Sequence, residues 1–171
     1  RWFGVDWDAV REGLATYQGV ERRFETVGSA CGILVVDDYA HHPSEIQATL
    51  AAARGAHPER RIVVVFQPHL YTRTRDFAEA FGEALSEADS IWVTQVFPAR
   101  EEPIEGVTGE MVALAAERAG GDVRYHPDVD TVAETVVEAL TSGDLLLTLG
   151  AGSVDRVAHE VVARLEESSH A

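Results

Sequence analysis

The most informative absence in this sequence is lysine. All 14 basic residues among the 171 are arginine. A Schiff base with a substrate carbonyl needs a lysine amine, and so does a phosphate-binding loop of the Gly-x-x-x-x-Gly-Lys-Ser/Thr type. Neither kind of site is therefore present in this chain. If the chain handles ATP, other groups must bind most of the phosphate charge.

Cysteine, long apolar runs and positive charge are also scarce. Cys31 is the single cysteine, so no disulfide forms within the chain. No apolar run approaches a length of about 20 residues, which spans a bilayer, or resembles the core of a signal peptide. The 29 acidic residues give a formal charge of -15, and such a surface repels phosphate backbones and anionic lipids. We expect a protein of a reducing cytoplasm with no nucleic-acid or membrane partner.

Apolar and amphipathic segments alternate along most of the chain. Several apolar segments, such as Ile-Val-Val-Val-Phe, are continuously hydrophobic, which is typical of strands buried on both faces of a parallel sheet. We predict an α/β fold with a doubly wound, mostly parallel sheet of about six strands and helices on both faces. The expected strands are 22–27, 33–36, 62–66, 90–96, 123–125 and 145–149, and the expected helices are 43–53, 76–88, 108–119, 131–140 and 154–166. A short helix before residue 19 looks detached from this pattern.

Ligands of open α/β sheets bind at the carboxyl ends of the strands. Residues 37–43, Asp-Asp-Tyr-Ala-His-His-Pro, follow one expected strand and enter a helix at the proline. Five polar side chains at such a place are costly unless they bind something. Asp and His are also ordinary loop residues, and they can ligate metal, but the spacing lacks the pairs of a zinc site. We predict no metal site here.

Residues 67–76, Gln-Pro-His-Leu-Tyr-Thr-Arg-Thr-Arg-Asp, follow the next apolar strand. Arg73 and Arg75 beside a helix N-terminus would form a cationic spot suited to a carboxylate or phosphate. The alternative is that either arginine pairs with Asp76 or Glu79 on the helix surface.

Two further segments carry weaker signals. Residues 150–153, Gly-Ala-Gly-Ser, lie between the last strand and the last helix, where they would admit either a ligand or another backbone. They do not form a Gly-x-Gly-x-x-Gly fingerprint, because Arg156 stands at the third glycine position. Residues 22–25, Arg-Arg-Phe-Glu, look by composition like the charged start of a strand.

These segments, in this order and spacing, resemble the C-terminal domain of the Mur ligases. The motifs are Gly-Val-Glu-Arg-Arg-Phe-Glu from residue 19, the segments at 37–45 and 67–76, and Gly-Ala-Gly at 150–152. The branch that joins L-alanine to UDP-N-acetylmuramate fits best. The murein-peptide branch typically has Phe in place of Tyr39 and lacks the second motif. A free-standing nucleotide-binding or interaction module is the alternative of another class.

The resemblance implies a three-domain, ATP-dependent bacterial ligase of peptidoglycan synthesis. Residues 1–20 would be the last helix of the central domain, and residues 21–171 the C-terminal domain. The ATP phosphate loop and most Mg²⁺ ligands would lie in the central domain, and UDP-N-acetylmuramate would bind chiefly to the N-terminal one. The isolated chain would then be inactive.

The resemblance also implies roles for residues of this chain. Arg23 matches the arginine that reaches the nucleotide phosphate, and Asp38 matches the aspartate that contacts the ribose hydroxyls. Two hydroxyl donors suit a carboxylate.

The amino-acid site is implied to contain Tyr39, His41, His69 and Arg73. Arg73 would bind the carboxylate of L-alanine, and His41 would orient its amine or relay its proton, so these two are the expected catalytic residues. Leu70 departs from the pattern, because many relatives carry a second arginine there, and no role in binding substrate charge transfers to it.

Overall fold

The computed structural model describes residues 4–16 and 19–169. Along these residues, strands and helices alternate after a first helix. The helices are α1 (Trp7–Thr16), α2 (Pro43–Ala56), α3 (Tyr71–Leu85), α4 (Gly109–Arg118), α5 (Val132–Ala139) and α6 (Asp155–Ser169). The strands are β1 (Glu25–Ala30), β2 (Ile33–Asp38), β3 (Arg61–Phe66), β4 (Ser90–Val93), β5 (Val123–Tyr125) and β6 (Asp144–Leu149). None of the described helices is both long and apolar enough to cross a membrane.

The six strands form one sheet in the order β1-β2-β6-β3-β4-β5. All neighbours are parallel except β1 and β2, which form an antiparallel hairpin. The hairpin turns at Cys31 and Gly32, both with positive φ, as a tight turn that matches the strand twist requires. β1 begins three residues later than predicted, because Arg22 and Phe24 adopt positive φ and interrupt an extended chain. The predicted mostly parallel sheet is confirmed.

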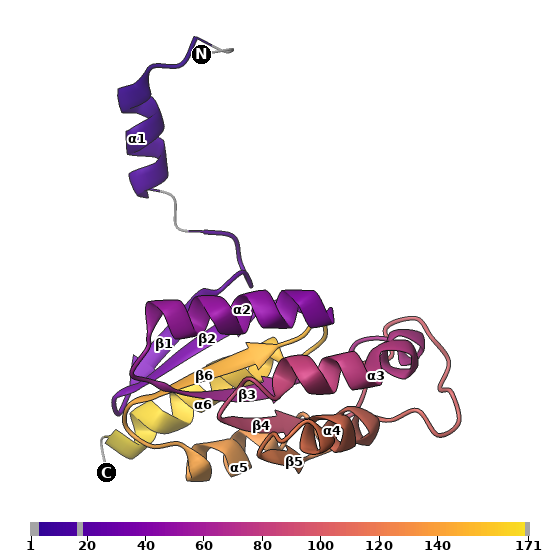
Figure 1. Ribbon diagram of the computed structural model, residues 1–171. Coiled ribbons are helices and arrows are strands. Elements are labelled where there is room, and N and C mark those ends of the chain that lie inside the picture. The colour runs from indigo at the N-terminus through magenta and orange to yellow at the C-terminus, as the bar shows by residue number, and fades with distance from the viewer. Residues whose placement is uncertain (1–3, 17–18, 170–171) are drawn as a thin grey trace.

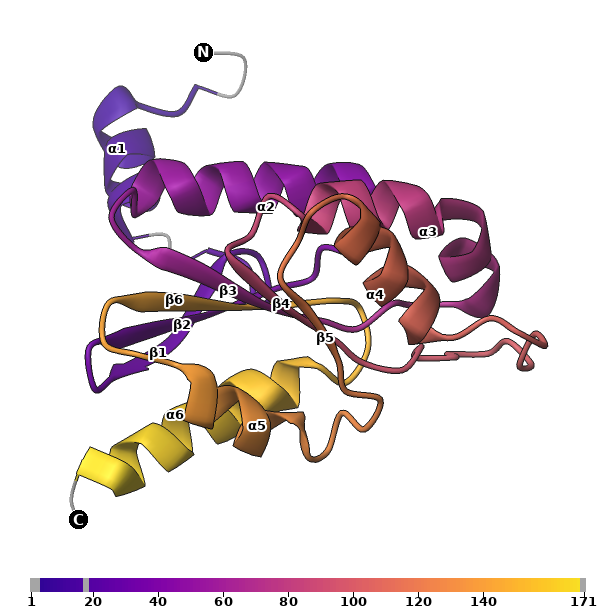
Figure 2. The same cartoon turned by 60° about the horizontal axis from the view of Figure 1, so that its bottom comes forward.

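Helices cover both faces of the sheet (Figures 1 and 2). α2, α3 and α4 pack on one face, and α5 and α6 on the other. Successive residues of the buried strands therefore serve two different cores: Val64 and Phe66 belong to the first, and Val63 and Val65 to the second. This division explains the continuously apolar strands and confirms the predicted doubly wound fold.

α3 begins at Tyr71, five residues before the predicted start. Leu70 at the N-cap position has no capping side chain. Instead, the distant Glu101 accepts hydrogen bonds from the N–H and the hydroxyl of Thr72, at 2.9 and 2.5 Å. Arg73 and Arg75 consequently lie inside the helix and not in the loop before it.

α1 has no buried residue and stands apart from the sheet in Figure 1. The apolar side chains of Trp7 and Leu14 on α1, and of Val5 just before it, are exposed. Residues 1–3, 17–18 and 170–171 of the predicted ranges 1–20 and 21–171 lie outside the described residues. That division into two domains stays a prediction.

Candidate functional site

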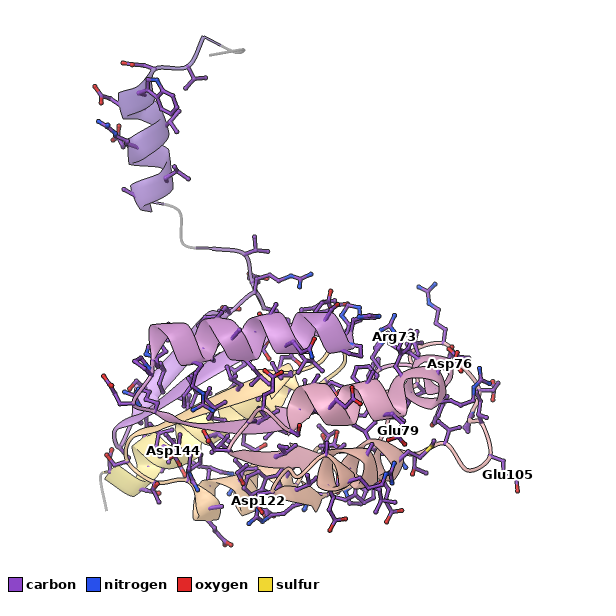
Figure 3. The ribbon with its side chains drawn as sticks, viewed as in Figure 1. Arg73, Asp76, Glu79, Glu105, Asp122 and Asp144 are labelled. Carbon is purple, nitrogen blue, oxygen red and sulfur yellow. The ribbon has the colours of Figure 1, made fainter. Side chains whose placement is uncertain are left out.

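Three of the predicted segments meet at one edge of the sheet. β2, β6 and β3 are neighbours, with Asp38 paired to Leu149 and Leu149 paired to Phe66 at their carboxyl ends. The chain leaving each of these strands therefore enters the same region. Figure 3 shows Arg73 there, near the start of α3, whereas Asp122 and Asp144 lie toward the opposite ends of their strands.

The first group at this edge consists of Tyr39, His41, His69 and Arg73, which we call the imidazole cluster. The ring centroids of Tyr39 and His41 are 5.2 Å apart, and those of His41 and His69 are 6.0 Å apart. Nη1 of Arg73 lies 3.4 Å from Nδ1 of His69. The structure thus brings together all four residues predicted for the amino-acid site.

His69 is held in the neutral state by its surroundings. Its ring stacks on Phe97 with centroids 5.7 Å apart. Burial, with the nearby Arg73 guanidinium and His41 ring, lowers the pKa of His69 below its ordinary value of 6.5. A neutral Nδ1 can accept a hydrogen bond from Arg73, and the 3.4 Å between the two nitrogens makes this a long one.

Arg73 and Arg75 have different surroundings. Nε of Arg75 lies 2.7 Å from Oδ1 of Asp76, and both side chains are about half exposed, so the surface pairing weighed from the sequence holds for Arg75. Within the described residues, no carboxylate forms an ion pair with Arg73, and Glu79 pairs with Arg118 instead. Of the two arginines, Arg73 is the one whose guanidinium is available to an anion.

The second group, which we call the hinge network, consists of Arg22, Asp37, Thr148, Gly150 and Gly152. The Arg22 guanidinium donates to Oδ2 of Asp37 at 2.8 Å and to the carbonyls of Gly150 and Gly152 at 2.7 and 3.1 Å. The Thr148 hydroxyl donates to Oδ1 of Asp37 at 2.6 Å. Burial raises the pKa of Asp37 above 3.8, outweighing the bonds from Thr148 and Arg22, which lower it.

The glycines at 150 and 152 admit the protein's own atoms. Gly150 has φ of 146°, and a Cβ there would lie 2.8 Å from the carbonyl oxygen of Gln67. A Cβ on Gly152 would lie 2.4 Å from Oε1 of Gln67 and 2.5 Å from Cγ of Phe97. The close approach that the sequence indicated is therefore made by the segments that follow β3 and β4.

Asp38 and Arg23 lie between the two groups. Asp38 is buried, and its two carboxylate oxygens accept the N–H groups of Phe24 and Ala40, each at 2.8 Å. Each oxygen keeps a second lone pair. Arg23 is exposed, with its Cζ 5.5 Å from the centroid of the Tyr39 ring. The nucleotide roles of both residues stay predictions.

Three residues of the site did not emerge from the sequence. By composition Arg22 is only part of a charged strand start, and Glu101 lies in the loop after β4. Glu45 is the third residue of α2 and accepts the N–H groups of His41 and His42 at 2.9 and 3.1 Å. The spacing of Glu45 from the residue before Pro43 is that of a capping box, which is a signal that would have found it.

The described residues contain no group of three or more carboxylate, imidazole or thiol side chains placed to hold a metal ion. The residues present therefore do not fit a self-contained magnesium site.

Comparison with known proteins identifies relatives of this chain. The family described as Mur ligase, glutamate ligase domain, matches residues 22–152. UDP-N-acetylmuramate–L-alanine ligases from Mycobacterium sp. (strain JLS) and Kineococcus radiotolerans are 51% and 52% identical, over 95% and 96% of this chain. A crystal structure of UDP-N-acetylmuramate–alanine ligase from Thermotoga maritima superposes with a TM-score of 0.82 at 28% identity and covers 98% of this chain. The chain spans about a third of each of these proteins, 34%, 35% and 35%.

Proposed function

Because this chain belongs to the Mur ligase family, we propose that it is the C-terminal domain of an ATP-dependent ligase that joins L-alanine to UDP-N-acetylmuramate. The imidazole cluster carries the proposal: a guanidinium without a carboxylate partner among the described residues lies beside two imidazoles. These groups suit the carboxylate and the amino group of a free amino acid. L-alanine is the amino acid in the names of the relatives that are about half identical.

The reaction requires positioned charge more than a protein nucleophile. The muramate carboxyl group is activated as an acyl phosphate, the amine of L-alanine attacks its carbon, and phosphate leaves as the amide forms. Charge develops on the attacking nitrogen and on the carbonyl oxygen, so fixed cations and a proton acceptor accelerate the step. In this chain, His41 is the candidate proton acceptor, and Arg73 is the fixed cation that would hold the amino acid in position for its attack.

We assign Arg73 to the carboxylate of L-alanine. Its position in the first turn of α3 fixes the start of the side chain, and its contact with the neutral His69 leaves most guanidinium donors unused. Tyr39 and His69 flank His41 and would bound the space for the small methyl side chain.

We assign Arg23 and Asp38 to the nucleotide. The support is the exposed guanidinium of Arg23 beside Tyr39 and the two remaining lone pairs of the buried Asp38 carboxylate. Such a carboxylate suits ribose hydroxyls, and a guanidinium suits phosphate.

The other partners belong to the rest of the proposed ligase. We infer that other domains bind the UDP-sugar and contribute the magnesium ligands. They would also contribute the lysine-containing phosphate loop, since this chain has no lysine. We place the enzyme in the bacterial cytoplasm. The site would then be completed only when the domains close on one another.

Steady-state kinetics of the complete ligase test the assignment of Arg73. Arg73→Ala should raise KM for L-alanine about 100-fold, because two charge-assisted hydrogen bonds are lost. Arg75→Ala is the matched control, since Arg75 lies in the same turn but pairs with Asp76, and it should behave like the wild type. Unchanged alanine kinetics in Arg73→Ala would remove Arg73 from the site. ATP turnover driven by a murein peptide and not by L-alanine would transfer the enzyme to the other branch.

A further inference from the structure

The side chain of Glu45 reaches the ring of His41. Its Oε2 lies 3.3 Å from Nδ1 of His41, and the carbonyl oxygen of Tyr39 lies 2.8 Å from the same nitrogen. Neither group can donate when Glu45 is ionised, because a carbonyl and a carboxylate only accept hydrogen bonds. Nδ1 must therefore carry the proton. In the neutral ring, the lone pair is then on Nε2.

Glu45 is fixed in place and ionised. The same Oε2 accepts the N–H groups of His41 and His42, so the carboxylate is tied to the start of α2 at three points. Burial alone would raise the pKa of Glu45, but those N–H groups, the His41 ring and the Arg23 guanidinium together lower it below 4.5. A negative charge therefore stays beside Nδ1 at neutral pH.

Nε2 is the part of His41 that the protein leaves unused. Across residues 4–16 and 19–169 no hydrogen bond to this atom is formed, whereas Nδ1 has two acceptors. The charged and titratable groups around the ring are Tyr39 at the end of β2, Glu45 on α2, His69 before α3, and Arg23, which acts on Glu45. Of these, only Glu45 contributes a negative charge next to the ring.

We propose that Glu45 is a positioning residue for the ligation: it holds His41 with its proton on Nδ1 and stabilises the imidazolium formed when Nε2 accepts a proton from the substrate ammonium. This inference rests on the proposed function. The α-ammonium of the amino acid loses one proton to Nε2, and the freed nitrogen lone pair forms the C–N bond to the acyl phosphate. The C–O bond to phosphate breaks with its electron pair, and the departing phosphate takes the second proton that the nitrogen loses as the neutral amide forms. The imidazolium later releases its proton to water.

The first test is the protonation pattern of His41 in this 171-residue chain. Long-range ¹H–¹⁵N NMR of histidine-labelled protein should show a protonated Nδ1 and an unprotonated Nε2 in the neutral ring. The opposite tautomer would overturn the proposal whatever the substrate of the ligase is.

The second test uses Glu45→Gln in the complete ligase. Glutamine keeps an acceptor for the two N–H groups but removes the charge, and the carbonyl oxygen of Tyr39 still accepts a hydrogen bond from Nδ1 of His41. We expect an unchanged tautomer, an unchanged KM for L-alanine and a kcat lowered at least about 10-fold, since a positioned base contributes about 100-fold or more. Activity should recover as pH rises, because the amine then loses its proton to solvent.

Ser44→Ala is the control in the same turn of α2. The Ser44 hydroxyl contacts Nδ1 of His42, 3.0 Å away, and not His41, so this variant should retain wild-type kcat. A Glu45→Gln enzyme with wild-type kcat, or with a defect in KM alone, would overturn the positioning role. If the wild-type enzyme does not turn over L-alanine, the proposed function is contradicted, but the NMR result for His41 is unaffected.

Discussion

The hinge network and the imidazole cluster lie at the same edge of the sheet but use arginine in opposite ways. In the hinge network, the Arg22 guanidinium meets one carboxylate and two carbonyls, and Asp37 and Thr148 are almost fully buried. In the imidazole cluster, Arg73 contacts only a neutral imidazole at 3.4 Å, among the groups that the structure describes. Buried polar groups are stable when the protein satisfies them. The saturated group is therefore structural, and the unsaturated one is available to a ligand.

Breaking the hinge network should have the largest effect on stability. Asp37→Ala removes the carboxylate that Arg22 and Thr148 share. The Thr148 hydroxyl then loses its acceptor, and the Arg22 charge keeps only the carbonyls of Gly150 and Gly152. We expect the free energy of unfolding to fall by about 3 kcal/mol, measured by urea denaturation.

Two control variants test whether the two groups differ in their contribution to stability. Asp76→Ala removes an exposed ion pair on α3, and Arg73→Ala removes the guanidinium of the imidazole cluster. Both should leave the urea midpoint unchanged. If Arg73→Ala destabilised the chain as much as Asp37→Ala does, Arg73 would be structural as well, and the contrast between the two groups would be wrong.

A smaller effect on the free energy of unfolding is expected when an ammonium group replaces the guanidinium at position 22. Arg22→Lys retains the attraction to Asp37, but one ammonium cannot span Asp37, Gly150 and Gly152 as a guanidinium does. We expect a loss of about 1–2 kcal/mol and faster amide hydrogen exchange at residues 150–153. Arg23→Lys, at the exposed neighbouring position, should change neither quantity. Wild-type exchange in Arg22→Lys would show that the loop does not depend on this arginine.

The sequence predicted the parts of this molecule that depend on local pattern. The strand at 123–125 has the predicted bounds, and the predicted strands 62–66 and 145–149 begin within one residue of β3 and β6. Continuous apolar runs indicated burial on both faces, and polar segments after those strands located the site. The residues of the imidazole cluster followed from a family resemblance carried by the same segments.

Apart from Glu45, whose partners are local, the missed features depend on partners far away in the chain. α3 begins at Tyr71 because Glu101 accepts the N–H and hydroxyl of Thr72 from 29 residues away. The Arg22 guanidinium bonds to carbonyls of Gly150 and Gly152, up to 130 residues away. A backbone carbonyl has no residue type, so no composition or spacing marks it as an acceptor. Sequence reasoning therefore placed the charged residues but not the groups that satisfy them.

The smallest expected effect is on the pH dependence of stability, which should differ between the hinge network and the imidazole cluster. The pKa of Asp37 is raised by burial, so its contribution to stability is complete below 3.8 and is lost as pH rises through the raised value. The pKa of His69 is lowered by burial, Arg73 and His41, so its contribution is present above 6.5 and is lost as pH falls through the lowered value.

Urea denaturation between pH 4 and pH 8 should show a shallower acid-side decline in His69→Gln than in the wild type. Asp37→Asn should keep that decline near pH 6, because the imidazole cluster is intact. The His69 effect is small, since the ring is only partly buried and solvent screens it. If the free energy of unfolding declined identically with falling pH in the wild type and in His69→Gln, His69 would not be held neutral by its neighbours. The assignment of its Nδ1 as the acceptor of a hydrogen bond from Arg73 would then be contradicted.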